Sequence, residues 1–449
     1  MRTRHRRLAG AVSILTSLLL VAACGAGGRS DDDGAGDGGS ASDVGVTADS
    51  ITVGGTFPLT GVAAPGYSEI PTGAQAYFDW VNDNGGVYGR SIDFEVKDDG
   101  YDPTKTSSLT NELVLQDQVF ATVGSLGTPT HSAVVDFLND EGVPDLFVSS
   151  GSLGWGDDPE ARPMTFGWQP DYEIEGKIIG QYVAEEMPDA KVGLFLQDDD
   201  FGADAEKGAR QFLDSQIVDV QRYTSGNTDI GPQIAGLQAS KPDIVLAFTT
   251  PSYTALAQLV SLKLGFAPQW YVSNVGSDPA LVGSLLEQFS EGAVPGDASA
   301  LNGVMTSEYI PGIDAQDDPW VQLWQQVWDA HGAKGELTNY RIYGMSWAYT
   351  FVQALQAAGE DLTREGLVDA LEEVGSSLEG PNLAPYRYSE DSHLGISGLQ
   401  LVELENGAGQ PLTDVLVTDI GDAEIATDDS GQADDGPPED GIPDVDAVE

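Results

Sequence analysis

Glycines and hydroxyl side chains follow the apolar stretch Val119–Val123 and are the residues best suited to hold a small ligand. The stretch is rich in β-branched residues and a helical pattern follows at once, which predicts a buried strand, a tight loop and a helix N-terminus. Free backbone N–H groups at such an N-terminus, with the hydroxyls of Thr128 and Thr130, would cradle a polar or anionic group. Gly124 and Gly127 would allow close backbone approach. We expect this loop to bind a molecule and not to transform it.

Catalytic chemistry has little support in this sequence. It contains no Gly-x-Ser-x-Gly elbow, no P-loop, no HExxH motif and no dinucleotide-binding glycine motif between a strand and a helix. Its four histidines lie where helix ends, turns and the N-terminal segment already explain them. Its acidic residues are scattered without metal-ligand spacing. We therefore expect no catalytic residues, no metal site and no cofactor.

Alternating strand and helix patterns surround this loop and have to position it. The predicted strands are 51–57, 92–96, 119–123, 145–148, 192–196, 217–223 and 244–248, and the helices between them include 73–84, 104–115, 173–186 and 203–213. Such alternation is typical of parallel sheets covered by helices on both faces, and a break near Gly167 divides it into two series. The predicted fold class is α/β, with two doubly wound lobes that bind ligand beyond the carboxyl ends of their strands.

The charge balance excludes several classes of partner. The 449 residues carry 72 acidic and 20 basic side chains, a formal net charge of −52. Such a charge argues against nucleic-acid binding and against docking of the protein surface on anionic lipid. A solvated anionic surface, as a saline habitat would favour, is the simplest interpretation.

The N-terminal segment has the pattern of an export signal. Basic and then apolar residues occupy positions 1–23, and the only cysteine of the chain, Cys24, follows Val21-Ala22-Ala23. This arrangement resembles the lipobox of bacterial lipoproteins, which implies attachment of a lipid to Cys24; a plain secretory signal or a short membrane anchor is the alternative. Composition further predicts a disordered Gly/Ser/Asp tether over residues 24–49 and a disordered acidic tail over residues 419–449.

Several loop motifs of the folded region form an ordered set. They are Gly54–Gly61, Gly85–Asp93, Asp98–Pro103, Asp199–Gly202 and Gly398–Val402. Together they resemble the type I substrate-binding proteins of ABC importers, and within that class the leucine/isoleucine/valine-binding branch. The resemblance spans about residues 51–404 and implies a clamshell of two lobes joined by crossover strands. Lobe 1 would comprise residues 50–167 and about 293–385, and lobe 2 residues 168–292 and about 386–418.

The resemblance also implies which residues hold the ligand. They are Tyr67, Leu126, Thr128, Ser149, Ser150, Gly151, Phe201, Thr250 and Tyr253. Leu126 and Thr128 would hold the ligand carboxylate, with a contribution from the loop that begins at Ser149. Phe201 occupies the place of an aromatic residue that covers the ligand from the opposite lobe, and Tyr67 would close the near side.

One departure from the family pattern concerns the ligand's charge. Amino-acid binders of this family place a carboxylate just after the strand that here ends at Phe248, whereas this chain has Thr249-Thr-Pro-Ser-Tyr253. A buried ammonium without a counter-charge is costly. Asp199, Asp200 or Asp278 would be the substitutes, although the first two equally suit the cap of the helix that starts there. Branched-chain amino acids, aromatic or other carboxylates and neutral molecules all remain candidate ligands.

The predicted function is capture of a small solute by closure of two lobes. The resemblance implies a monomeric lipoprotein on the outer face of the bacterial cytoplasmic membrane, attached through its lipid alone. It would deliver an amino acid or organic acid to the permease and ATPase subunits of an ABC importer. A ligand-presenting sensor component is the alternative, and an enzyme of unknown reaction is the weakest one.

Overall fold

A five-stranded parallel sheet forms the centre of the first lobe. The computed structural model describes residues 43–448, so the predicted signal segment and Cys24 lie outside the described residues. The strands, in spatial order, are β2 (Ser91–Asp98), β1 (Ser50–Phe57), β3 (Ala121–Val123), β4 (Asp145–Val148) and β5 (Thr165–Gly167). Strands β3 and β4 are buried throughout, which matches their continuous apolar sequences.

The helices of the first lobe come from two separate parts of the chain. They are α1 (Ala64–Tyr67), α2 (Ile70–Asp83), α3 (Pro103–Leu115), α4 (Thr128–His131), α5 (Val135–Asp140), α11 (Pro319–His331), α12 (Asn339–Ala357) and α13 (Arg364–Val374). Helix α12 is buried on every side from Ile342 to Leu355. Its backbone touches that of α2, because a Cβ on Gly344 would lie 2.1 Å from the Ile70 carbonyl oxygen. Close packing of these two helices therefore depends on glycine.

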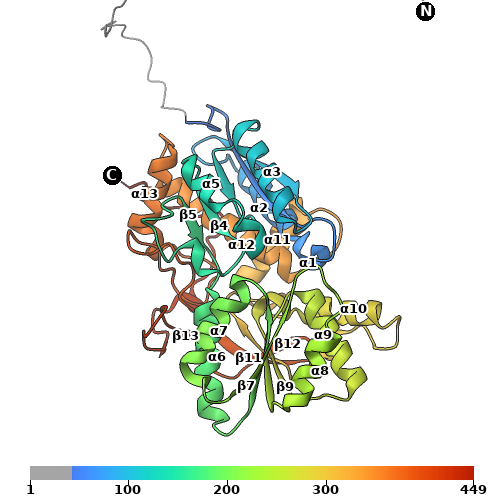
Figure 1. The fold of residues 1–449 in the computed structure, drawn as a ribbon. Coiled ribbons are helices and arrows are strands. Elements are labelled where there is room, and N and C mark those ends of the chain that lie inside the picture. The colour runs from blue at the N-terminus through green and yellow to red at the C-terminus, as the bar shows by residue number, and fades with distance from the viewer. Residues whose placement is uncertain (1–42, 449) are drawn as a thin grey trace, which may run out of the picture. The chain divides into compact units, whose positions relative to one another are not determined.

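The second lobe is built on a nine-stranded sheet. Its parallel part is β7 (Ile217–Tyr223), β6 (Val192–Gln197), β8 (Ile244–Phe248), β9 (Gln269–Val272) and β10 (Met305–Glu308); the antiparallel part is β11 (Gly398–Glu405), β12 (Ala408–Pro411), β13 (Leu416–Val417) and β14 (Ala426–Thr427). The helices of this lobe are α6 (Tyr172–Glu186), α7 (Asp200–Leu213), α8 (Gly231–Ser240), α9 (Pro251–Leu264) and α10 (Pro279–Phe289). Helices α6 and α7 cover one face of the sheet and α8 and α9 the other (Figure 1). The α/β fold class and all seven predicted strands are confirmed.

The lobe boundary differs from the sequence-based expectation at one place. Strand β10 pairs in parallel with β9 and antiparallel with β11, so it belongs to the second sheet. The chain therefore returns to the first lobe after Glu308 and not near residue 293. Three segments connect the two sheets: 168–171 after β5, 309–318 after β10 and 386–397 before β11.

The C-terminal segment also differs from its prediction, because it is held by defined contacts. The side chains of Trp320 and Trp80 donate hydrogen bonds to the carbonyl oxygens of Asp435 and Asp440, at 2.8 and 3.0 Å. Pairing of β14 with β13 ties the preceding part of the segment to the second sheet. Acidic composition predicted disorder, whereas backbone carbonyls of this segment accept hydrogen bonds from tryptophans of two helices, α2 and α11.

Two further observations limit what the fold can contain. Between residues 43 and 448, no helix is both long and apolar enough to cross a bilayer. In the same range, no group of three or more His, Cys, Asp or Glu side chains is placed to hold a metal ion.

Candidate functional site

A cavity of about 180 Å³ lies where the strands of both sheets end. It receives Leu126 from the loop after β3 and Ser149 from the end of β4 in the first lobe. The second lobe contributes Phe201 at the start of α7, Thr250 after β8 and Glu308 at the end of β10. Carboxyl ends of parallel strands are the usual ligand-binding edge of α/β sheets, so this cavity is the candidate site.

The loop after β3 forms one end of the cavity with its hydrogen bonds already made. The Thr128 hydroxyl lies 2.8 Å from the Ser150 hydroxyl, which also accepts from the Tyr172 phenol at 3.4 Å. The loop turns at Gly127 with a φ of 111°, and a Cβ there would lie 2.5 Å from the Tyr101 ring. A glycine is therefore required at this turn by both its backbone angle and its neighbour. We call this the hydroxyl end, defined by Thr128 and Ser149.

Gly124 and helix α4 have roles that differ from those predicted from the sequence. A Cβ on Gly124 would lie 2.5 Å from the Trp347 ring, so this glycine makes room for α12 and not for a ligand. The Thr130 hydroxyl donates to the Leu126 carbonyl oxygen at 2.7 Å. Helix α4 is a single turn, Thr128–His131, before α5 begins. Side-chain hydroxyls therefore supply most of the polarity of this end.

The sequence-based candidates separate into two groups in the structure. Those that line the cavity are Tyr67, Leu126, Thr128, Ser149, Phe201 and Thr250; those outside the lining are Ser150, Gly151 and Tyr253. Ser150 lies directly behind Thr128, and Gly151 is packed beneath the Tyr172 ring. The Tyr253 ring stacks on Tyr223 with 4.0 Å between centroids, inside the core of the second lobe.

An aromatic pair forms one wall. The Phe201 and Tyr172 rings both line the cavity, with centroids 4.3 Å apart. Phe201 is fixed at the first turn of α7 because its backbone N–H donates to the Asp199 side chain at 3.1 Å. Asp199 is thus the N-cap of α7 and does not line the cavity. Burial raises its pKa to about 6.

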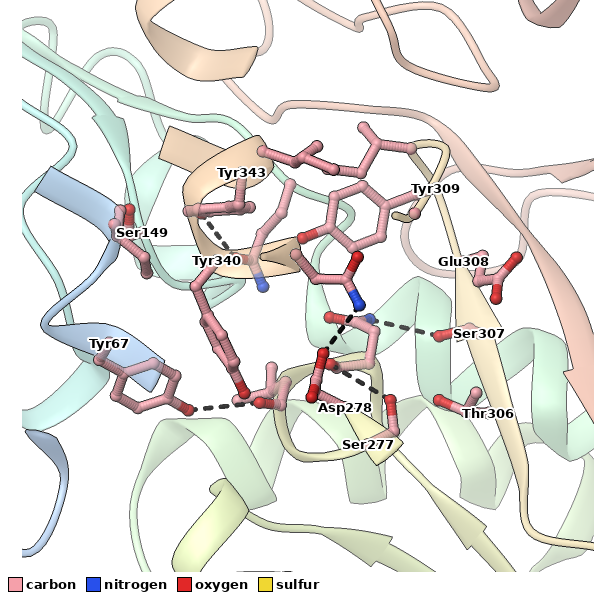
Figure 2. Close-up of a pocket in the computed structure, with 18 of the residues that line it drawn as sticks. Tyr67, Ser149, Ser277, Asp278, Thr306, Ser307, Glu308, Tyr309, Tyr340 and Tyr343 are labelled. Atoms are coloured by element: carbon pink, nitrogen blue, oxygen red, sulfur yellow. Dashed lines mark hydrogen bonds between the residues drawn. The ribbon is translucent and has the colours of Figure 1, made fainter. Parts of the chain in front are cut away.

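Sequence reasoning missed several lining residues, which come from loops after β2 and β9, from the start of α6, from the crossover segments and from α12. These are chiefly tyrosines and amides: Tyr101, Gln169, Tyr172, Asn274, Tyr309, Asn339, Tyr340 and Tyr343. Figure 2 shows Tyr340 and Tyr343 in the middle of the pocket, between Ser149 and Tyr309. The one indication in the sequence was that segments 168–171 and 309–318 connect the two sheets. The second of these segments was not recognised as a connection, because the lobe boundary was predicted near residue 293.

A buried carboxylate supports the floor of the cavity. Glu175 of α6 is fully buried and accepts hydrogen bonds from the Tyr271, Ser273 and Ser307 hydroxyls at 2.7–2.8 Å and from the Asn274 N–H at 3.0 Å. Burial raises its pKa, while these donors act in the opposite direction. Because Asn274 and Ser307 line the cavity, Glu175 holds two floor residues from different strand ends in fixed positions.

The charged side chains in the described lining of the cavity are all acidic. Its lining, as far as the structure describes the chain, contains Asp278, Glu308 and Asp314 and no Lys, Arg or His. Asp278 is engaged on both oxygens, accepting from the Leu281 N–H and from the Asn339 amide at 2.7 Å each. Burial raises the pKa of Glu308 to about 7, and the Asp314 carboxylate adds to the increase. We call Thr306, Glu308 and Asp314 the acidic end.

Three buried polar atoms of the lining have no hydrogen-bond partner within residues 43–448. They are Ser149 Oγ, Gln169 Nε2 and Thr306 Oγ1. Buried polar groups in native proteins are nearly always hydrogen-bonded, so unsatisfied ones in a cavity mark where a bound molecule would supply the partner. The three atoms come from the residue after β4, from a crossover segment and from β10.

Hydrogen bonds join the two lobes around the cavity. The Ser252 hydroxyl donates to the Val62 carbonyl oxygen at 2.9 Å, and the Leu153 N–H donates to Asp204 at 3.0 Å. The bond from Asn339 to Asp278 is a third such contact. Burial raises the pKa of Asp204 to about 7, and the nearby Asp200 carboxylate acts in the same direction. The structure is thus that of a closed pair of lobes.

Comparison with known proteins places most of the chain in one family. A family profile described as periplasmic binding protein matches residues 50–409. A Leu/Ile/Val-binding protein homolog 1 from Brucella abortus (strain 2308) is 25% identical over 362 residues, which are 80% of this chain and 91% of the relative.

Solved structures share the fold at lower sequence identity. A branched-chain amino acid ABC transporter protein from Thermus thermophilus with bound valine superposes with a TM-score of 0.71, at 20% identity over 83% of this chain and 98% of that one. A fatty acid ABC transporter substrate-binding protein from Thermomonospora curvata gives 0.70, at 23% identity over 83% of this chain and 94% of that one. At these identities the likeness concerns the fold alone.

Proposed function

We propose that this chain, which belongs to the periplasmic binding protein family, captures a small ligand between its lobes and delivers it to an ABC-type importer. It is a binding protein and not an enzyme. The observation that carries the proposal is the cavity itself, lined by strand ends of both lobes and by buried polar atoms without partners. A ligand that contacts both lobes stabilises the closed form over the open one.

The hydroxyl end is the place we propose for a carboxylate. Thr128 and Ser149 offer hydroxyl donors there, and the aromatic pair of Phe201 and Tyr172 offers apolar surface beside it. A branched-chain amino acid or a related carboxylate fits this combination. The names of the similar proteins support the same range, since one holds valine and another is named for fatty acids.

The cellular setting follows from the N-terminal sequence. We propose export, cleavage before Cys24 and lipid attachment to its thiol, which would tether a monomer to the outer face of the cytoplasmic membrane. Metabolic labelling with a radioactive fatty acid tests the anchor. Label on the wild-type protein and none on Cys24→Ala is the expected result, whereas label on both variants, or on neither, contradicts lipidation at Cys24.

Ligand binding at the hydroxyl end is tested by Thr128→Ala. The substitution removes a hydroxyl that would donate to a charged group, and such bonds contribute about 1.5–3 kcal/mol, so affinity should fall roughly 10- to 100-fold. Calorimetric titration with the tightest ligand from a panel of amino acids and organic acids measures this. Thr104→Ala, an exposed site on α3, is the matched control and should bind normally. Equal affinity of Thr128→Ala and wild type would place the ligand elsewhere.

A further inference from the structure

The acidic end of the cavity has a chemistry that the hydroxyl end lacks. Thr306 and Glu308 lie on β10, and Asp314 follows on the crossover segment. Figure 2 places Glu308 at the opposite side of the pocket from Tyr67 and Ser149. None of these three residues was a candidate from the sequence.

The Glu308 carboxylate packs against the backbone of Gly409, where the absence of a side chain leaves space for it. A Cβ on Gly409 of β12 would lie 2.2 Å from Glu308 Oε1. Glu308 is only partly exposed, and its strongest charged neighbour is another acid, Asp314. Asp314 is exposed, so its own charge is solvated, but that charge and the burial of Glu308 both disfavour a charged Glu308 carboxylate. In the described part of the lining no cationic side chain offsets the Glu308 charge, and a positively charged ligand group would.

The Thr306 hydroxyl is a second and independent sign of a missing molecule. Its side chain is 2% exposed, and its Oγ1 has no hydrogen-bond partner among residues 43–448. Leaving a buried hydroxyl unsatisfied costs about 1–3 kcal/mol. A ligand N–H donor placed between Thr306 and Glu308 would satisfy the hydroxyl and neutralise the carboxylate together.

A purely structural role explains Asp278 but not Glu308. Asp278 caps α10 and binds the Asn339 amide, so both of its oxygens have donors from the protein. Glu175, the other buried acid near the cavity, has four donors. Glu308 thus differs from its two acidic neighbours in facing the cavity without such a set of protein donors.

We propose that β10 carries a second subsite of the cavity, in which Glu308 and Thr306 receive a positively charged nitrogen of the ligand. The substrate is then a carboxylate that also bears an ammonium or guanidinium group, and not a plain carboxylic acid. This inference rests on the proposed function in one respect, because it requires the ligand to occupy the same cavity. Charge-assisted hydrogen bonds of this kind are about twice as strong as neutral ones.

Two pairs of probes, each differing in one ammonium group, test the proposal. Lysine is compared with norleucine, and leucine with 4-methylpentanoate, by calorimetric titration of the wild-type protein and of Glu308→Gln. In at least one pair the member with the additional ammonium group should bind tenfold tighter or more, and Glu308→Gln should remove that difference while leaving the member without that group unchanged. No preference within either pair, or a preference that survives Glu308→Gln, overturns the proposal.

Controls separate this outcome from failure of the fold or of the proposed function. Glu405→Gln, an exposed site on β11 with the same change of charge, should behave as wild type. Thr306→Val removes the unpartnered hydroxyl at nearly constant volume, so it should weaken the amine-bearing probes selectively without lowering thermal stability.

If none of the four probes binds, native mass spectrometry of the freshly purified protein identifies the molecule that it carries. An amine-free bound molecule overturns the proposal, and an amine-bearing one that Glu308→Gln loses supports it. If Thr128→Ala is the only variant that loses every ligand, the result tests the proposed function and not this subsite.

Discussion

The two ends of the cavity differ in charge, although each has one buried hydroxyl without a partner among residues 43–448, Ser149 Oγ at one end and Thr306 Oγ1 at the other. At the hydroxyl end, Thr128 is already bonded to Ser150, which in turn accepts from Tyr172. At the acidic end, the Thr306 hydroxyl has no partner in residues 43–448, and Glu308 lies beside a second acid. Neutral hydroxyls can bind the carboxylate that many ligands share, whereas a carboxylate without a cationic neighbour favours a ligand with a positive charge. The comparison therefore assigns general affinity to the first end and selectivity to the second.

The largest effect is expected from substitution of Glu175, which holds residues of the cavity floor in place. Glu175→Ala leaves four buried donors without their acceptor, and each unsatisfied group costs about 1–3 kcal/mol, so the free energy of unfolding should fall by about 3 kcal/mol or more. Urea denaturation measures this loss. Because Asn274 and Ser307 both lose their anchor, amine-bearing and amine-free ligands should be weakened alike. Selective loss of one kind would show that Glu175 serves a single end.

A smaller effect, confined to the hydroxyl end, is expected from Gly127→Val. A β-branched residue at a φ of 111° is strained, and its Cβ would lie 2.4 Å from the Thr130 hydroxyl. We expect affinity for every carboxylate ligand to fall about 100-fold, measured by calorimetry. Gly85→Val, where a Cβ meets no atom within 4 Å at a φ of 109°, is the control for backbone strain alone. Comparable losses in the two variants would remove the argument for a shaped loop.

A pH effect is expected at the contact between the lobes. The Asp204 pKa is raised to about 7 in the closed structure by burial, so this form binds a proton more tightly than a solvated Asp does. Closure is therefore favoured as pH falls through 7, and the advantage is lost as pH rises above it. Affinity for an amine-free probe such as 4-methylpentanoate should be about 3- to 10-fold higher at pH 6 than at pH 8. Calorimetry should show a flatter pH profile for Asp204→Asn, and an identical profile would contradict this assignment.

The smallest effect is expected on the stability of the unliganded protein, which the acidic end lowers. Because burial raises the Glu308 pKa to about 7, its cost to stability begins above the ordinary pKa of a Glu, about 4.3, and is complete above pH 7. Glu308→Gln should thus raise stability by on the order of 1 kcal/mol at pH 8 and by little near pH 4. Thermal unfolding at both pH values checks this. A loss of stability at pH 8 would mean that Glu308 has a structural partner after all.

The same contrast explains what the sequence could and could not predict. The hydroxyl end lies on two loops that directly follow the apolar strands β3 and β4, so Leu126, Thr128 and Ser149 could be predicted from local pattern and family resemblance. The acidic end depends on β10, a four-residue strand whose place in the second sheet is set by distant partners, β9 and β11. Short strands carry little periodicity, and register is a tertiary property.

Residues that support the site from behind were equally hard to find. Ser150 and Gly151 were expected to contact the ligand, yet they lie behind Thr128 and beneath Tyr172. Tyr253 follows β8 as predicted, but its ring turns into the core and stacks on Tyr223. One residue of register decides which side chains of a strand-end loop face the cavity, and that is fixed by packing and not by sequence pattern.

The most direct test of the account is calorimetric titration of the tightest panel ligand into wild type, Thr128→Ala and Glu308→Gln under one set of conditions. The account predicts that both substitutions weaken binding at least tenfold, because they act at opposite ends of one cavity. Wild-type affinity in both variants would contradict the claim that the ligand lies between the two lobes.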